Sequence, residues 1–219
     1  INATSFYVNT YYWGLSSTQI GGLSLSLYIG LLLAFAITPV MSRESDKRDA
    51  AVRLSLFALL FGPAPILAAM LGWMPPKGST DLAIALFLHT GLLFVALISI
   101  SMLCASMIAD ITDQNELQTG QRHEGLLAAV MTFVIKATSG LGTLLAGVVL
   151  DLIAFPGGLS APSPGGEHPG LAVDAAAAES LGAVVALLML GLFALSVWFL
   201  WRYPLRRAEH AAIVRQMRR

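Results

Sequence analysis

The sequence predicts an all-α, polytopic bundle of transmembrane helices, and three observations lead to this fold class. Of the 219 residues, 56% are hydrophobic and only 12% are charged, whereas soluble domains carry about 25% charged residues. Five stretches are long and apolar enough to cross a bilayer as helices, which takes about 20 residues each. The basic residues gather on one side of these stretches. So much apolar surface must face lipid or neighbouring helices rather than water.

The predicted spans fill residues 14–201 and are separated by short polar or glycine-rich and proline-rich segments. They lie at about 22–41, 52–73, 82–109, 125–150 and 181–201. Residues 1–13 are too short to cross the membrane, and we interpret them as the outer end of a helix that is cut at its start. The aromatic run at residues 11–13 is typical of a belt at the membrane interface.

Two features inside and between the spans are predicted from backbone chemistry. Gly62, Pro63 and Pro65 are expected to interrupt the second span, because proline lacks a backbone donor. Residues 73–79 are rich in proline and glycine and predict a tight external turn, after which Asp81 is expected to cap the next helix.

The distribution of lysine and arginine predicts the orientation, because cytoplasmic loops are enriched in these residues. If the chain starts outside, the cytoplasmic segments are residues 42–53, 110–124 and the tail at 202–219. They hold eleven of the thirteen basic residues: Arg43, Lys47, Arg48, Arg53, Arg122, Arg202, Arg206, Arg207, Arg215, Arg218 and Arg219. The opposite side holds only Lys77. We therefore predict a multi-pass protein of the inner or plasma membrane whose C-terminus is cytoplasmic.

Composition also excludes several classes of function. The formal net charge is zero, so we expect no nucleic-acid partner. The one cysteine, Cys104, lies in an apolar run and is interpreted as a packing residue. The four histidines lack the spacing of metal ligands, and no nucleophile is paired with a base. We therefore expect no metal site, no cofactor and no enzymatic activity.

Lys136 is the most informative single residue. It lies 11 residues after Gly125 and 14 before Leu150, which places it near the middle of the bilayer. An ionisable group at this depth costs roughly 3 kcal/mol or more and usually faces a polar cavity or a partner. Asp151, beyond the far end of the same span, is about 22 Å away along the axis. The counter-charge is therefore expected from other sequence, another subunit or a ligand; the alternative is a neutral lysine or a local water defect.

A second signal is the acidic segment at the end of the third span. It carries three acids at every third position: Asp110, Asp113 and Glu116. They lie near a helix C-terminus, where the helix dipole disfavours negative charge, so Arg122 or the basic segment at 43–53 must offset them. Breaking and re-forming such a cluster can latch one side of a protein that switches conformation; an ordinary solvated loop is the alternative. Glu124 begins the next helix, where its charge is favourable.

Four further residues are candidates for a polar site within the membrane. Thr132 lies one helical turn before Lys136 on the same face, where it adds a hydroxyl to a shared site or bonds the backbone of its own helix. His89 lies about two turns inside the external end of the third span and is a candidate for handling protons or substrate. Asn9, together with Thr10, is expected to line the same cavity from the cut helix.

The run from Met107 to Leu150 resembles helix 11, and the loop before it, of the glycoside-pentoside-hexuronide:cation symporters, the family of the melibiose permease. Three parts match at fixed spacing: AD-x-x-D-x-x-E, TG-x-R-x-E-G and T-F-x-x-K. The segments YVNTYYWGLSSTQIG and SRESDKR resemble the end of helix 7 and the loop after helix 8. The resemblance covers essentially the whole chain and is most specific over residues 107–150.

This family belongs to the major facilitator superfamily, whose twelve helices form two pseudo-symmetric halves around a central cavity. The resemblance implies that the chain supplies the C-terminal half, from the outer part of helix 7 to helix 12. A six-helix N-terminal half is then a partner and holds the main cation-binding carboxylates. Lys136 and Thr132 are implied in cation and sugar coupling, and the residues at 110–124 in the cytoplasmic gate.

The resulting hypothesis is a symporter that uses a gradient of Na⁺ or H⁺ to move a sugar or glycoside by alternating access. Sugar sites often present an aromatic platform, yet all four tryptophans lie near span ends. The sugar therefore rests on the resemblance. The alternatives are a related carrier of a non-sugar solute or amphiphile, and a non-transporting membrane module.

Overall fold

The computed structural model describes residues 2–44, 46–120, 124–153 and 175–202. In chain order the helices are α1 (Asn2–Tyr7), the π-helical turn η1 (Val8–Tyr12), α2 (Ser17–Glu44), α3 (Lys47–Phe61), α4 (Ala64–Met70), α5 (Thr80–Thr119), α6 (Glu124–Leu152) and α7 (Ala175–Trp201). These ranges contain no strand. The predicted all-α bundle is confirmed.

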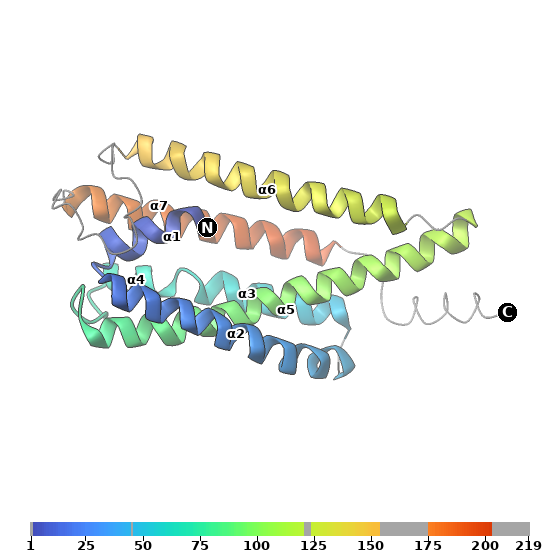
Figure 1. The fold of residues 1–219 in the computed structure, drawn as a ribbon, viewed down its shortest axis with the longest axis horizontal. Helices are drawn as coiled ribbons and strands as arrows, with labels where there is room; N and C mark the ends of the chain where they lie inside the picture. The colour runs from blue at the N-terminus through green and yellow to red at the C-terminus, as the bar shows by residue number, and fades with distance from the viewer. Residues whose placement is uncertain (1, 45, 121–123, 154–174, 203–219) are drawn as a thin grey trace.

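Five helical stretches are long and apolar enough to cross a membrane. They are Ser17–Ser42, Lys47–Met70, Thr80–Asp113, Gly125–Leu152 and Ala176–Trp201. They run along one common direction, and α5 extends past the other helices at the end where α2 gives way to α3 (Figure 1). We term that end, where Lys47 and Arg48 lie, the basic end, and the opposite end, at residues 71–79, the turn end.

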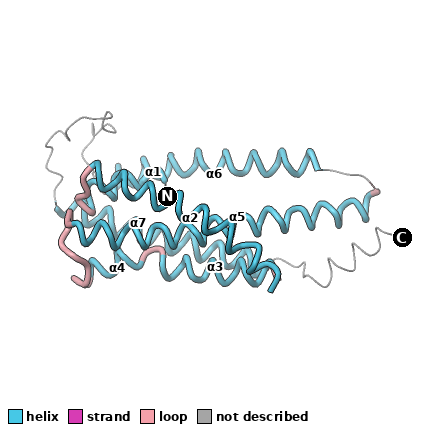
Figure 2. Tube along the Cα trace, turned by 60° about the horizontal axis from the view of Figure 1, so that its bottom comes forward, coloured by secondary structure: helices cyan, strands magenta, loops and turns pink. Residues whose placement is uncertain are grey.

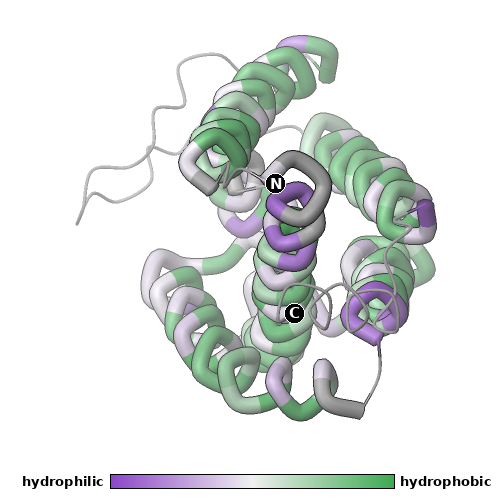
Figure 3. The backbone as a smooth tube through the Cα atoms, turned by 90° about the vertical axis from the view of Figure 1, so that its right-hand side faces the viewer, coloured by the Kyte–Doolittle hydropathy of each residue, from purple (hydrophilic) through white to green (hydrophobic). Residues whose placement is uncertain are grey.

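The outward faces of the helices are apolar, as a lipid solvent requires. Viewed along the bundle, most of the residues in most of the helices are hydrophobic (Figure 3). Leu32 on α2 is 70% exposed and Leu60 on α3 is 74% exposed, and many other large apolar side chains are exposed as well. Water-soluble proteins rarely expose apolar side chains over so much of their surface.

The closest packing in the bundle joins α2 to α5. Four small or hydroxyl-bearing residues recur at every fourth position of α2 and are buried: Ser26, Gly30, Ala34 and Thr38. A Cβ atom added at Gly30 would lie 2.7 Å from the carbonyl oxygen of Gly91 on α5. Further along, the hydroxyl oxygens of Thr38 and Ser99 lie 2.8 Å apart. Small residues let membrane helices approach closely, and we term this contact the α2–α5 seam.

Helix α3 packs between α5 and α7 through a second face of small residues. Its fully buried positions are Ala50, Ala51, Ser55 and Ala58. Just beyond its end, a Cβ atom at Gly62 would lie 2.8 Å from the ring of Phe193 on α7. In contrast, α6 lies along the edge of the bundle and contacts the rest mainly through α1 and α7 (Figure 1).

The second span is broken, as its glycine and prolines predict. Helix α3 ends at Phe61 and α4 begins at Ala64, and the break shows as a short loop between them (Figure 2). The predicted cap of the third span is wrong. Ser79 is the N-cap, and its hydroxyl accepts a hydrogen bond from the Leu82 N–H, while Asp81 lies in the first turn.

The turn end corrects a second expectation. Tyr12 and Trp13 are 3% and 4% exposed, so these two rings belong to the core and do not form an interfacial belt. The α4–α5 connection folds back over them: the Gly78 N–H donates to the Trp13 carbonyl at 2.9 Å, and the Lys77 ammonium lies 4.5 Å from the centre of the Tyr12 ring. Gly182 of α7 leaves the room that this ring occupies.

The α2–α5 seam is tested by Gly30→Ala, with Gly22→Ala as the matched control. A Cβ atom at Gly22 meets nothing within 4 Å, and alanine is favoured over glycine in a helix by about 1 kcal/mol. Gly22→Ala should therefore keep or slightly raise the melting temperature of the detergent-purified complete protein. Gly30→Ala should lower it by several degrees, because two backbones must separate. Equal melting temperatures would contradict the close approach.

Candidate functional site

Lys136 lies near the middle of α6, and its side chain is exposed. Within the described ranges it makes no hydrogen bond and no ion pair. The buried residues of α6 are Ala146 and Val149, about three turns away toward the turn end. The lysine thus lies on a part of α6 that the other described residues leave uncovered.

Thr132 is also exposed, one turn before Lys136. Its hydroxyl donates to the Ala128 carbonyl of its own helix at 2.9 Å, which is the structural role that the sequence left open for it. This bond uses the hydroxyl proton and leaves the oxygen able to accept one. Thr132 and Lys136 therefore present an acceptor and a cation on one stripe of α6.

Asn9 and Thr10 lie in η1, the π-helical turn that ends at Tyr12. Such wide turns are rare and are frequent at functional sites. The Asn9 carbonyl accepts from the Leu15 N–H at 3.0 Å, and its side chain is half-buried. The Thr10 hydroxyl oxygen is buried without a hydrogen-bond partner among the described residues, which is unusual for a buried polar atom.

His89 is not brought to the other candidates. Its Nε2 atom lies 2.8 Å from the Phe61 carbonyl oxygen, and its ring stacks on the Phe61 ring with centres 4.5 Å apart. In the described part of the chain no hydrogen bond joins it to Asn9 or Lys136. The histidine faces the break between α3 and α4.

The acidic segment of α5 finds its positive partner on α3. Both carboxylate oxygens of Asp110 lie 2.8 Å from the Lys47 ammonium, and the side chains are only 14% and 33% exposed. The basic segment at 43–53 was one of two expected sources of this charge, but nothing in its sequence distinguished Lys47 from its neighbours. The other source, Arg122, lies outside the described residues.

The rest of the acidic segment covers the end of α5 and the start of α6. Asp113 and Glu116 are half-buried on the last turns of α5. The Glu116 carbonyl accepts from the Gly120 N–H at 2.8 Å, and Gly120 ends the helix with a φ of 67°, a left-handed conformation that favours glycine. Glu124 is the first residue of α6.

Arg48 completes a clamp at the basic end that sequence reasoning missed. Its guanidinium donates to the Trp201 carbonyl at the end of α7. Two adjacent cations at the start of a helix are disfavoured by its dipole, and here each has an acceptor on another helix. We term Lys47, Arg48, Asp110 and the Trp201 carbonyl the basic clamp; it holds the start of α3 to α5 and α7.

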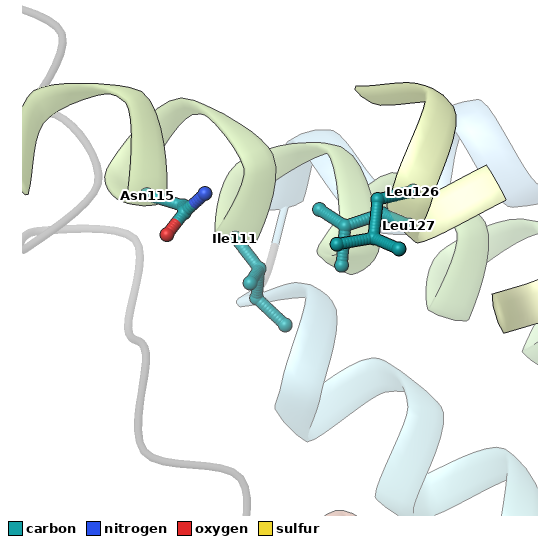
Figure 4. A pocket seen from close by; sticks show the side chains of 4 residues that line it. All are labelled: Ile111, Asn115, Leu126 and Leu127. Carbon is teal, nitrogen blue, oxygen red and sulfur yellow. The ribbon is translucent and has the colours of Figure 1, made fainter. Parts of the chain in front are cut away.

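A shallow hollow opens beside the clamp, between the end of α5 and the start of α6. It has a volume of about 340 Å³ and is lined by Ile111, Asn115, Leu126 and Leu127 (Figure 4). Leu126 lies ten residues, or about 15 Å, before Lys136 along α6. The hollow is thus mostly apolar and separate from the lysine. In the described ranges no group of three or more His, Cys, Asp or Glu side chains is placed to hold a metal ion.

The family described as MFS/sugar transport protein matches residues 1–207. An uncharacterized symporter of Synechocystis sp., sll1374, is 28% identical over 210 residues, which cover 93% of this chain and 35% of that relative. The chain therefore spans about a third of the length of the curated relative. No solved structure matches.

These matches confirm the family-level resemblance, and together with the five apolar helices they indicate a multi-pass membrane protein. Since the family match covers nearly all of its length, the chain belongs to the MFS/sugar transport protein family.

Proposed function

We propose that the protein containing this chain is a secondary active transporter, in which a gradient of Na⁺ or H⁺ drives the symport of a sugar or glycoside by alternating access. The chain supplies its C-terminal half, and the basic end with the C-terminus faces the cytoplasm across the inner or plasma membrane. The family and the name of the Synechocystis relative support transport and symport. The coverage of 35% of that relative supports a larger whole.

One observation carries the proposal: Lys136 is exposed in the middle of α6 and has no acidic partner in the described chain. A lysine in the membrane needs a counter-charge or a water-filled cavity. We place α6 against a central cavity, where carboxylates from the other half neutralise the ammonium. A coupling cation that binds those carboxylates competes with Lys136. Cation binding then changes where α6 is held, which links the cation to the conformation.

The solute is recognised in this proposal by neutral polar groups around the lysine. Thr132 offers a hydroxyl oxygen as acceptor, and Asn9 offers an amide from η1. Sugar hydroxyls are donors and acceptors at once, so they suit a site of amides and hydroxyls.

The basic clamp and the acidic segment divide the gating task. The Lys47–Asp110 pair lies within one half, so it keeps α3 and α5 together as one body while that half moves. Asp113 and Glu116 lie further along the part of α5 that extends past the other helices (Figure 1). We propose that these two acids, with Arg122 and Glu124, pair with the other half when the cytoplasmic side is closed.

A second candidate is a carrier of an amphiphile. The apolar hollow at the basic end, with its single amide at Asn115, favours this reading because it suits an alkyl chain better than a sugar. Uptake of labelled glycosides and of a labelled lysolipid into vesicles that contain the complete protein separates the two. We expect accumulation of a glycoside only when a Na⁺ or H⁺ gradient is imposed. Gradient-independent movement of the lysolipid alone would favour the second candidate.

Lys136→Met tests the coupling residue, with Val134→Met as the control on the opposite side of α6. Methionine keeps the length of the side chain and removes the charge, which leaves the proposed carboxylates without their partner. Gradient-driven accumulation should fall by about tenfold or more, given the cost of an uncompensated charge in the membrane, while Val134→Met stays close to the wild type. Wild-type accumulation by Lys136→Met would show that the lysine does not couple the cation to the solute.

Exchange of the two clamp charges tests the ion pair. Lys47→Asp and Asp110→Lys each place two like charges together and should lower transport by about fivefold. The double variant restores an opposite-charge pair and should regain more than half of the lost rate. If the double variant is as slow as the worse single variant, the pair does not hold α3 to α5. Asp49→Lys, at an exposed acid two residues from Lys47 and on the opposite side of α3, serves as the control.

A further inference from the structure

The break in the second span leaves two backbone acceptors without their usual donors. In a continuous α-helix the carbonyls of residues 59 and 61 accept from the N–H groups of residues 63 and 65. Residues 63 and 65 are prolines and have no N–H. On either side of the break, the Gly62 N–H donates to the Ala58 carbonyl at 2.8 Å and the Leu67 N–H donates to the Pro63 carbonyl at 3.1 Å. Phe61 is therefore one of the two positions at which the prolines leave a carbonyl in need of a donor from outside the helix.

His89 of α5 supplies that help. Its Nε2 atom lies 2.8 Å from the Phe61 carbonyl oxygen, 28 residues away in sequence. A carbonyl only accepts, so Nε2 carries the proton and donates. The His89 ring also stacks on the Phe61 ring at an interplanar angle of 27°. The Phe57 ring stacks on the same Phe61 ring, with ring centres 4.7 Å apart. The ring plane and the donor atom are thus both fixed.

The two sides of the break are anchored to different parts of the bundle. Helix α3 is held at the basic end by the basic clamp, and Ile66 of α4 is buried in the core of the turn end. Gly62, between them, lies under the Phe193 ring of α7. A bend at residues 62–65 would therefore change the angle between these two anchored ends, and the contact between His89 of α5 and Phe61 lies at that bend.

We propose that His89 is a positioning residue for the transport cycle: by donating to the Phe61 carbonyl in place of the missing Pro65 N–H, it ties α5 to a hinge in the second span. This role differs from proton or substrate handling. Its effect on transport rests on the proposed function, whereas its effect on the stability of the fold does not.

The test uses a substitution that returns the missing donor. Pro65→Ala gives residue 65 an N–H that reaches the Phe61 carbonyl within the helix, so it should make His89 dispensable. His89→Phe keeps a stacking ring and removes the donor. Pro39→Ala is the matched control, because Pro39 also lies inside a transmembrane helix, and its removal adds a donor far from Phe61.

Melting temperatures of the detergent-purified complete protein give the first readout. His89→Phe should melt several degrees below the wild type, because a partly buried acceptor within the span is left unsatisfied. His89→Phe with Pro65→Ala should regain more than half of that loss, and His89→Phe with Pro39→Ala should regain none. If both double variants behave alike, or if His89→Phe melts with the wild type, the proposal is overturned whatever the protein transports.

Uptake kinetics give the second readout. His89→Phe should lower the maximal rate by about fivefold through the unsatisfied carbonyl and leave the KM for the solute within about twofold, with the rate recovered by Pro65→Ala. If His89→Phe fails to fold, His89→Gln replaces it in this test. Glutamine keeps a hydrogen-bond donor at a similar distance from the backbone, so His89→Gln should retain most of the wild-type rate. A raised KM, or a rate that Pro65→Ala does not recover, would assign His89 to the substrate or to proton transfer and overturn the hinge role.

Discussion

The hydrocarbon core of a membrane offers no hydrogen-bond partner, so each polar group in a span must be satisfied by the protein itself. This constraint accounts for most of the polar contacts in the described chain. Hydroxyls in the spans return to their own helices, as Thr132 does to the Ala128 carbonyl. Where prolines break the second span, a histidine from α5 reaches one of the two freed carbonyls. At the basic end, outside the hydrocarbon core in the proposed topology, the clamp cations Lys47 and Arg48 each also take an acceptor from another helix.

Lys136 departs from this rule, and its helix departs from the packing of the others. The α2–α5 seam and the small-residue face of α3 bring α2, α3, α5 and α7 into close contact, whereas α6 lies at the edge (Figure 1). A charged residue on an uncovered helix makes sense when another part of the protein completes the site. In the proposed function, the exposed lysine and the loosely packed helix mark the surface at which the other half completes the site, and the share of the Synechocystis relative that this chain covers agrees with that proposal.

Sequence reasoning predicted the features that depend on local chemistry. Hydropathy predicts long apolar helices, because a span needs its own run of apolar residues, and Pro63 and Pro65 predict a break, because the missing donors are local. The partners across helices were beyond it. The sequence marks His89 as a candidate polar residue, but its partner, the Phe61 carbonyl, is known only from the structure, in which α5 lies beside the break. Tyr12 and Trp13 have the composition of an interfacial belt, and the folded-back connection at residues 71–79 buries them. Asp81 was predicted to cap the third span, although serine caps a helix equally well. The choice between Ser79 and Asp81 depends on the residue at which the helix begins, and the structure places that start at Thr80.

The central claim is that Lys136 faces a water-filled cavity shared with the rest of the protein. The most direct measurement is the reaction of Lys136→Cys with a membrane-impermeant maleimide, in a cysteine-free version of the complete protein in which Cys104 is also replaced. Val134→Cys, at nearly the same depth on the opposite side of α6, is the reference. We expect Lys136→Cys to react several times faster than Val134→Cys and to be slowed by the transported solute. Equal rates for the two positions, with no effect of solute, would contradict the claim.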